Sequence, residues 1–378
     1  MGVDEKKEAG ISRRGVLICG AYGHGNAGDE AILEAIIAEM RGIDPLMPLT
    51  VLSRRPDETG ARFGVSALHT FDFFGFLRVM RRTKLYINGG GSLIQDVTSR
   101  RSLWYYLFTI AAAKILGNRV LMYGCGIGPV SRFYNRRLVR SVLNRYVDII
   151  TLREPNSLEE LRDFGVIRPE VILSSDPALS LPAAEPEAVS AAMSALGLDP
   201  NGRYACFALR RWQGFNERAG EFSAAARYVY GKYGLTPLFL SINHRNDGDA
   251  SELAAATLRD IPYHILRDPM ETSLAIGLLS RMALVISMRL HGLIFAARAG
   301  TPAVGISYDP KVSAFLDYMG NELYVSLEDV EAGGLCSLID SALTRDFDFE
   351  RRQQLIGRER LNVEAARRLL GDIPTAPL

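Results

Sequence analysis

Residues 16–37 read VLICGAYGHGNAGDEAILEAII, which is an apolar run, a glycine-rich turn and a helical pattern in direct succession. The run 16–20 has the length and composition of a buried strand, and an amphipathic helical pattern follows Gly28. A strand joined to a helix by so short a turn is the first half of a βαβ unit. This stretch therefore predicts a parallel sheet covered by helices.

The same alternation of β-rich apolar runs and helical patterns continues along the chain. One predicted set of strands comprises residues 16–20, 49–53, 84–88, 119–125, 148–153 and 170–175, and a second comprises residues 204–210, 237–242, 263–266, 284–289 and 303–307. Between the sets, residues 181–202 contain three prolines and one short helical segment, as in a linker. The pattern predicts an α/β fold with two Rossmann-like, doubly wound domains that face a cleft.

The expected boundaries follow from this division. We expect an N-terminal domain over residues 12–180, a linker over 181–202, a C-terminal domain over 203–345, and a C-terminal helix and tail over 346–378. The helix itself is predicted over 347–370. Ligands of such folds bind at the carboxyl ends of the strands, so sites are sought directly after them.

Composition and charge exclude several classes of protein. The 378 residues are 48% hydrophobic and 23% charged, which is ordinary globular usage, and a net charge of +1 argues against a nucleic-acid partner. The N-terminal segment lacks the apolar core of a secretory leader, and no apolar stretch reaches the roughly 20 residues of a spanning helix. A cytoplasmic protein is expected. The four cysteines lack zinc-site spacing, and no metal is expected.

The first glycine turn supports two interpretations. Its GxGxxG spacing over residues 23–28 matches a dinucleotide fingerprint, and arginines at 54–55 could meet an NADP phosphate. Against this, Asp29 and Glu30 occupy the helix start, where they would repel a diphosphate. Carboxylates there suit a polyhydroxylated neutral ligand, although Asp29 as a plain helix cap is nearly as well supported.

Two more strand ends are rich in glycine, NGGGS over residues 88–92 and GCGIG over 124–128. Three such turns on one predicted edge let backbone approach a ligand closely and favour a binding cleft. Asp96, shortly after the first of them, is a candidate hydroxyl-binding or base residue, and equally a candidate helix cap.

Strand ends of the second domain carry cations instead. These are Arg210 and Arg211 in LRRW, Arg289 in MRLHG and Lys311 in YDPK. Arginine forks and a lysine point charge together suit a small, highly charged anion. His291 follows Arg289 by two residues and could move a proton near that anion, although a lone histidine is as often structural. Arg153, at the end of a first-domain strand, could also reach the cleft.

An acidic pair, Asp247-Gly248-Asp249, has the form of a divalent-metal motif of some glycosyltransferases. The spacing from Asp249 to Glu252 before an apolar helical run instead fits a capping box. We favour the cap, so no metal is required.

Two segments combine aromatic and basic residues. They are FDFFGFLRVMRRTK over residues 71–84 and SRFYNRRLVRSVLNRY over 131–146, and the second has five arginines and no acid. This composition is typical of helices that rest on an anionic membrane. A core-facing aromatic stripe with a solvated basic face explains either segment alone slightly better.

Three stretches together resemble the polysaccharide pyruvyl transferases, most closely the bacterial kind that modifies cell-wall polysaccharide precursors. They are GAYGHGNAGDEAIL, YINGGGSLIQDVTSRRSLWYYL and SMRLHGLIFAARAGTPAVGISYDPKV, which span both predicted domains in order. The resemblance implies a glycosyltransferase-B-like fold and phosphoenolpyruvate as donor. It also implies an N-acetylmannosamine acceptor on a lipid diphosphate-linked saccharide, a 4,6-ketal product, and a role in anchoring surface-layer proteins.

The resemblance also implies roles for matching residues. Arg289, His291 and Lys311 are similar to donor and catalytic residues, Arg153 to a family arginine in a TLRE-type segment, and Arg210 or Arg211 to the donor-binding arginine. Where other members commonly have an aromatic residue after the first glycine turn, this chain has His24. The expected site therefore has His291, Lys311 and Arg153 as catalytic residues, Arg210, Arg211 and Arg289 for the donor, and Gly25, Asn26, Asp29, Gly90, Gly91 and Asp96 for the acceptor.

The expected reaction needs proton transfer and stabilisation of a leaving phosphate, so no cofactor is expected beyond phosphoenolpyruvate as co-substrate. The expected partners are phosphoenolpyruvate and the lipid-linked saccharide, with peripheral contact at the inner face of the cell membrane through residues 71–84 and 131–146. A nucleotide-sugar glycosyltransferase and an NADP-dependent oxidoreductase are the alternatives, and a non-catalytic sugar-binding module is the weakest one.

Overall fold

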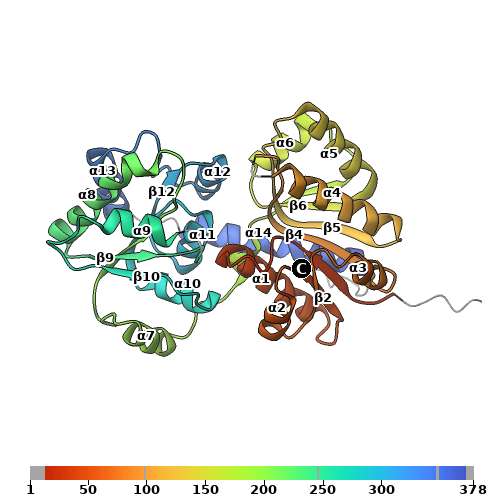
Figure 1. The fold of residues 1–378 in the computed structure, drawn as a ribbon, viewed down its shortest axis with the longest axis horizontal. Helices are drawn as coiled ribbons and strands as arrows, with labels where there is room; N and C mark the ends of the chain where they lie inside the picture. Colours follow the sequence, from red (N-terminus) through yellow and green to blue (C-terminus); the bar gives the residue numbers. More distant parts are fainter. Residues whose placement is uncertain (1–12, 98, 245–246, 346–348, 372–378) are drawn as a thin grey trace, which may run out of the picture.

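Two parallel β-sheets, one in each half of the chain, organise the computed structural model of the protein (Figure 1). The structure describes residues 13–97, 99–244, 247–345 and 349–371. Residues 1–12, which make up most of the segment expected not to be a secretory leader, lie outside the described residues. Within the described part, no helix is both long and apolar enough to cross a membrane.

The first sheet has seven strands in the order β3-β2-β1-β4-β5-β6-β7. Its strands are β1 (Val16–Cys19), β2 (Leu49–Ser53), β3 (Ser66–His69), β4 (Leu85–Ile94), β5 (Arg119–Ile127), β6 (Ile149–Leu152) and β7 (Glu170–Leu173). Six of them were predicted. The short β3, half-exposed at the sheet edge, lacks the apolar character on which strand prediction depends.

The glycines expected to form two turns, except Gly128, lie inside paired strands instead. β4 continues through its glycine triplet to Ile94, and β5 continues to Ile127, because the two strands pair along this length. Gly90 has a φ of +60°, and a Cβ there would lie 2.0 Å from Ile32 Cγ2. These glycines therefore serve close packing of the helix against the sheet as well as approach to the site.

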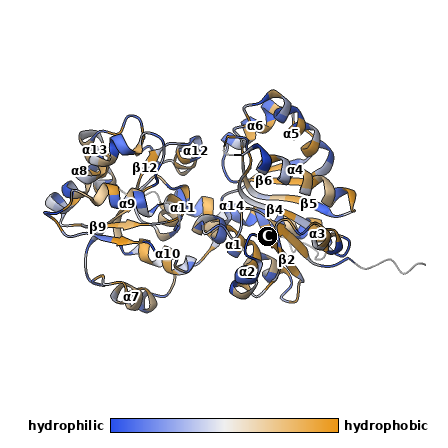
Figure 2. Cartoon of the chain, in the orientation of Figure 1, coloured by the Kyte–Doolittle hydropathy of each residue, from blue (hydrophilic) through white to orange (hydrophobic). Residues whose placement is uncertain are grey.

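Helices cover both faces of the first sheet. They are α1 (Ala27–Ile43), α2 (Pro56–Phe63), α3 (Phe73–Met80), α4 (Arg100–Ile115), α5 (Phe133–Tyr146) and α6 (Asn156–Phe164). Residues of α3 to α6 share one core cluster, and residues of α1 and α2 belong to the cluster on the other side. A sheet buried on both faces explains why its strands consist of nearly continuous apolar runs, which Figure 2 shows in the hydrophobic colours.

The second sheet has six strands in the order β10-β9-β8-β11-β12-β13. They are β8 (Tyr204–Ala208), β9 (Thr236–Leu240), β10 (His264–Leu266), β11 (Met282–Ser287), β12 (Ala303–Ser307) and β13 (Tyr324–Ser326). Five were predicted, and β13 has only three residues. In each sheet the order of strand addition reverses between two neighbouring strands, β1 and β4 in the first sheet and β8 and β11 in the second. Such switch points are where doubly wound folds bind ligands.

Helices also surround the second sheet. They are α7 (Pro186–Ala195), α8 (Phe215–Tyr233), α9 (Gly248–Ala255), α10 (Thr272–Ser280), α11 (Leu290–Ala299), α12 (Pro310–Met319) and α13 (Ala332–Thr344), preceded by the 3-10 turn η1 (Pro177–Ser180). The helix of the expected linker, α7, packs through Val189 and Met193 into the core of the second domain.

The last helix, α14 (Phe349–Leu370), crosses from one sheet system to the other (Figure 1). Near its start, Leu355 belongs to the core of the second domain, and near its end Val363 and Leu370 belong to that of the first. The main chain of Leu355 accepts a 2.6 Å hydrogen bond from Ser175 Oγ. The first two residues of the predicted helix, 347–348, lie outside the described residues.

Glu359 on α14 gives a testable pH dependence. Burial, and next the charge of Glu39, raise its pKa to about 8. The folded state holds a proton that the unfolded chain releases at its ordinary pKa of 4.5, so the free energy of unfolding should fall as the pH rises toward 8.

Glu359→Gln should abolish this fall and stabilise the protein at high pH by about 2 kcal/mol or more. Urea unfolding on both sides of that interval measures it. Glu364→Gln, at an exposed position of the same helix, is the matched control and should leave the wild-type pH dependence intact. The same pH dependence in Glu359→Gln and the wild type would contradict the burial argument.

Candidate functional site

A cavity of about 300 Å³ lies between the two domains, where strands of both sheets end. The first domain contributes residues that follow β1, β5 and β6 and the end of β4, and the second contributes residues that follow β8, β9, β11 and β12. Eight residues from the expected site line it: Asn26, Asp29, Gly91, Arg153, Arg210, Arg289, His291 and Lys311.

The turn between β1 and α1 places an amide and a carboxyl on the first-domain wall. Asn26 caps α1, and its Nδ2 donates a 2.6 Å hydrogen bond to Asp29 Oδ2. Burial raises the pKa of Asp29 to about 6, although the bond from Asn26 opposes the shift. Asp29 is therefore a carboxyl that can accept or donate a hydrogen bond near neutral pH.

Two amide groups of this turn are already bonded, which disfavours a dinucleotide. Gly23 N donates to Glu30 Oε1 at 2.7 Å, and Ala27 N donates to the carbonyl of Ile242 at 3.0 Å. A pyrophosphate would need these N–H groups. The arginines expected to meet an NADP phosphate are engaged as well, since Arg55 pairs with Glu58 and Arg54 lies over the Phe71 ring.

Arg153 is held rigidly at the end of β6. Its Nε donates to Glu154 at 2.9 Å, Nη1 to Asp176 at 3.0 Å and Nη2 to Ser92 Oγ at 3.0 Å, and the residue is 4% exposed. Two buried carboxylates balance one guanidinium here. Arg153 therefore fixes the geometry of this wall and brings little uncompensated positive charge.

Arg289 follows β11 and is paired with a buried aspartate. Its Nε lies 3.0 and 2.9 Å from the two carboxylate oxygens of Asp247, which is fully buried. Asp247 also accepts a 2.7 Å bond from the amide of Asn243. The expected capping box is wrong, because α9 begins at Gly248 and Asp249 lies inside its first turn. The first aspartate of the motif instead orients an arginine of the cavity.

Arg210 lies between two aromatic rings at the end of β8. Its guanidinium carbon is 4.6 Å from the centre of the Trp212 ring and 5.0 Å from that of Tyr308, and Nη1 donates to the Tyr308 hydroxyl at 2.5 Å. Among the described residues, no carboxylate is within ion-pair distance of Arg210. It is therefore the cavity cation whose charge remains available to a ligand.

Lys311 lies at the N-terminus of α12. Asp309 caps this helix by accepting a bond from the Lys311 amide, and its other oxygen lies 2.8 Å from Lys311 Nζ. The lysine is 28% exposed, so an incoming anion can compete for it at a helix end that already favours negative charge.

His291 is the buried imidazole of the cavity. It is 8% exposed, its Nε2 lies 3.9 Å from Asp176 Oδ2, and within the described structure Nε2 has no hydrogen-bond partner. Burial lowers its pKa to about 4, against the opposing charge of Asp176, so the ring is neutral at pH 7. A Cβ on Gly28 would lie 2.0 Å from His291 Nδ1, so this glycine leaves the space that the ring occupies.

Four expected site residues lie outside the cavity lining. Gly25 lines a separate hollow beside Arg55, Gly90 packs against α1, and Arg211 is exposed next to Arg210. Asp96 accepts bonds from the amides of Ser131 and Arg132 and from Asn135 Nδ2, so it holds the start of α5. His24, whose role was open, is also exposed.

Sequence reasoning assigned no role to four groups that shape the site, Ser92, Asp176, Tyr308 and Asp309, and it placed Asp247 in a metal or capping motif. Asp176 follows β7 and directly precedes a proline. The sequence signal that could have identified it as a site residue is an acid close to a strand end. The pairing of Asp247 with Arg289 joins residues 42 positions apart and had no local signal.

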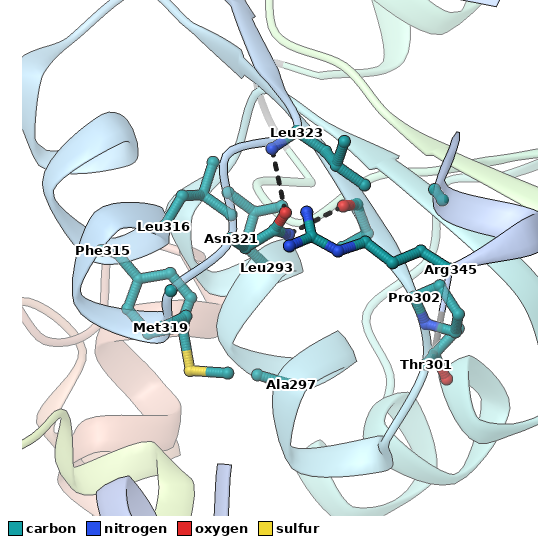
Figure 3. Close-up of a pocket in the computed structure, with 13 residues that line it drawn as sticks. Leu293, Ala297, Thr301, Pro302, Phe315, Leu316, Met319, Asn321, Leu323 and Arg345 are labelled. Carbon is teal, nitrogen blue, oxygen red and sulfur yellow. Dashed lines mark hydrogen bonds between the residues drawn. The ribbon is translucent and has the colours of Figure 1, made fainter. Parts of the chain in front are cut away.

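A second cavity, of about 270 Å³, lies among α11, α12 and α13 (Figure 3). Leu293, Phe315, Leu316 and Met319 give it an apolar wall. Its amide, Asn321, is satisfied by the carbonyl of Ala303 and the amide of Leu323. Apart from Arg345, which projects into it from the end of α13, its lining offers no charged group for chemistry.

Comparison with known proteins identifies the fold and the family of the chain. The curated amylovoran biosynthesis protein AmsJ of Erwinia amylovora is 24% identical over 313 residues, covering 75% of this chain and 70% of that one. UDP-GlcNAc 2-epimerases with the glycosyltransferase-B-like fold share the architecture. The one from Methanocaldococcus jannaschii has a TM-score of 0.65 at 10% identity over 94% of this chain and 98% of its own.

The enzyme from Neisseria meningitidis, bound to UDP-GlcNAc, has a TM-score of 0.63 at 11% identity over 93% and 99% of the two chains. These likenesses establish the fold. The family model of polysaccharide pyruvyl transferases matches residues 26–310, from the cap of α1 to the start of α12. The chain therefore belongs to the polysaccharide pyruvyl transferase family and acts in pyruvyl transfer during polysaccharide biosynthesis.

Proposed function

We propose that the protein transfers a pyruvyl group from phosphoenolpyruvate to N-acetylmannosamine in a lipid diphosphate-linked cell-wall polysaccharide precursor. The product is a 4,6-ketal, and phosphate is released. The observation that supports this most is the asymmetry of one cavity. Its second-domain wall carries Arg210, Arg289, Lys311 and His291, and its first-domain wall carries Asn26 and Asp29.

The donor carries a phosphate and a carboxylate, and the second-domain wall suits both. Arg210 supplies charge that no described carboxylate offsets, and Lys311 can exchange its contact with Asp309 for a ligand oxygen. Arg289 is held by Asp247 and presents a fixed donor edge. Together they stabilise phosphate as negative charge grows on the leaving oxygen.

The reaction also requires proton transfer. One sugar hydroxyl adds to C2 of the donor while C3 gains a proton; the C2–O bond to phosphate then breaks, and a second hydroxyl adds to C2. The first hydroxyl loses one proton and C3 gains one. The proton of the second hydroxyl leaves with the phosphate. A neutral His291 near Asp176 can accept and return such a proton, so we assign it as the acid/base. No further cofactor is proposed.

The alternatives have less support. Bonded amides in the first turn disfavour a dinucleotide. The aromatic rings that could stack on a nucleotide base, Trp212 and Tyr308, enclose Arg210 instead. This arrangement favours a small anion over a nucleotide sugar as donor.

Incubation with phosphoenolpyruvate and a lipid-linked disaccharide containing N-acetylmannosamine should add one cyclic pyruvate ketal to the acceptor, detected by mass spectrometry. Phosphate should be released only when acceptor is present. Thermal shift with phosphoenolpyruvate, UDP and NADP separately should show stabilisation by the first alone. An unchanged mass across several acceptors, or stabilisation by a nucleotide alone, would contradict the assignment.

Arg210→Met should weaken phosphoenolpyruvate binding and raise its KM by about tenfold to a hundredfold, because the charged hydrogen bonds to the donor are lost. The adjacent Arg211→Met is the control, since that side chain is exposed and outside the cavity lining. Steady-state kinetics with varied donor distinguish them. Equal effects of the two substitutions would refute the placement of the donor beside Arg210.

Gly28→Ala should act like His291→Ala, because the new methyl group claims the space of the imidazole. Both should lower kcat by about a hundredfold or more, while donor binding measured by thermal shift persists. Gly42→Ala, on the same helix with open space around its Cα, should retain wild-type turnover. Near-normal turnover of His291→Ala with donor bound would end the acid/base assignment.

A further inference from the structure

We propose that the outer face of α3, α4 and α5 binds the surface of an anionic membrane. This face, called the basic aromatic face below, comprises the exposed side chains of these three helices and of Phe71 before α3. The binding itself is independent of the proposed reaction. Its use for presenting a lipid-linked acceptor rests on the proposed function.

Exposed apolar side chains concentrate on this face. Of the sixteen large hydrophobic side chains that are exposed in the described structure, nine belong to this face. Phe74 is 79% exposed, Phe133 is 66% and Phe71 is 64%. Such clustering marks an interaction surface, since single exposed apolar residues are scattered on an ordinary protein surface.

Contacts join the three helices into one continuous face. The Phe73 ring of α3 lies 6.2 Å from the Phe108 ring of α4. Between α4 and α5, Trp104 Nε1 donates to Asn135 Oδ1 at 3.0 Å, and Arg100 donates to the Tyr134 hydroxyl at 3.3 Å. Figure 1 shows these helices on one side of the first sheet, where they share a core cluster beneath. The two segments noted in the sequence therefore have α4 between them.

The charge of the face is strongly one-sided. Helices α3, α4 and α5 contain eight arginines and lysines and no acid, and Asp72, Asp96 and Asp148 lie in the segments beside them, while the whole chain has a net charge of +1. The rest of the chain is therefore net negative. Of these eight cations, Lys114 is paired with Asp148. Asp96 is occupied by two amides and Asn135 at the start of α5. Arginines with exposed aromatic rings suit anionic headgroups above and acyl chains below.

The face adjoins the proposed site. Helices α3, α4 and α5 each begin near the carboxyl edge of the first sheet, the edge at which the cavity opens. Val97, shortly before α4, is 60% exposed and also lines the cavity. A protein resting on this face would have the acceptor wall of its cavity next to the membrane, where a lipid diphosphate anchors a saccharide.

Flotation with vesicles tests the binding without any activity measurement. The wild type should float with vesicles of phosphatidylglycerol and phosphatidylcholine, release them as salt rises, and fail to float with phosphatidylcholine alone. Arg78→Gln combined with Arg101→Gln should weaken binding roughly twentyfold, since each arginine contributes about a factor of five. Arg203→Gln combined with Arg259→Gln, at exposed positions of the second domain, is the matched control.

A second pair of double variants tests the contribution of the exposed apolar side chains to vesicle binding. Phe74→Ser combined with Phe133→Ser should weaken binding by about tenfold or more. Leu46→Ser combined with Ile167→Ser, at residues 86% and 82% exposed elsewhere, should leave binding unchanged. All four double variants should convert a lipid-free acceptor at the wild-type rate, which also shows that they fold.

Several results would overturn the membrane assignment. They are no flotation of the wild type with anionic vesicles, equal flotation with neutral ones, or equal losses in the control pairs. A wild-type dimer that Phe74→Ser with Phe133→Ser converts to a monomer would identify the face as a contact between copies. Vesicle binding without pyruvyl transfer would refute the proposed function alone, and pyruvyl transfer without vesicle binding would refute the membrane surface alone.

Discussion

The contact between Gly28 and His291 is the constraint on which the site depends. A buried imidazole from the start of α11 lies so close to the first turn of α1 that no side chain larger than hydrogen fits between them. The amide of Ala27 next to it bonds to the carbonyl of Ile242. Side chains join the two domains as well, since Thr272 Oγ1 donates to Glu34 Oε2 at 2.7 Å and Ala31 and Ala35 of α1 belong to the second-domain core cluster. The cavity keeps its shape only while the two domains stay together. Crossing helix α14, anchored in both cores, supports the same arrangement.

The pairing of cations with carboxylates is the second feature that shapes the cavity. Three of its four cations have carboxylate partners: Arg153 has Glu154 and Asp176, Arg289 has Asp247, and Lys311 has Asp309. Such pairing lowers the cost of burying charge and fixes the direction of each side chain. Arg210 is held by aromatic rings instead, so its charge is left for a ligand. Rigid paired cations with one available guanidinium suit a small dianion that changes charge during reaction.

Much of this architecture was predictable from sequence, because strand and helix signals are local. Doubly buried strands such as β1 and β11 consist of apolar runs, and the positions after them supplied most of the cavity residues. Edge strands β3 and β13, which are short and partly exposed, were not predicted. The resemblance to the family supplied the reaction, which neither spacing nor charge alone could identify.

What escaped prediction depends on contacts between distant residues. Nothing near Gly28 shows that it makes room for His291, and its place in a GxGxxG spacing favours the usual dinucleotide interpretation. Asp96, expected either at the acceptor or as a cap, holds the start of α5, and Asp247, expected in a metal motif or a capping segment, orients an arginine. An acid can serve either purpose, and only the fold decides which one. The same holds for the basic aromatic face, because contacts between helices far apart in the sequence join its parts.

The central claim is that one anion-binding wall, formed around Arg210 and closed by His291 against Gly28, holds phosphoenolpyruvate. A crystal structure of the protein with phosphoenolpyruvate bound tests it most directly. The account predicts the donor in the interdomain cavity, with its phosphate and carboxylate contacting Arg210, Arg289 and Lys311 and its C2 and C3 facing His291. A donor bound away from these residues, such as in the apolar cavity beneath α12 or at the β1–α1 turn, would contradict it.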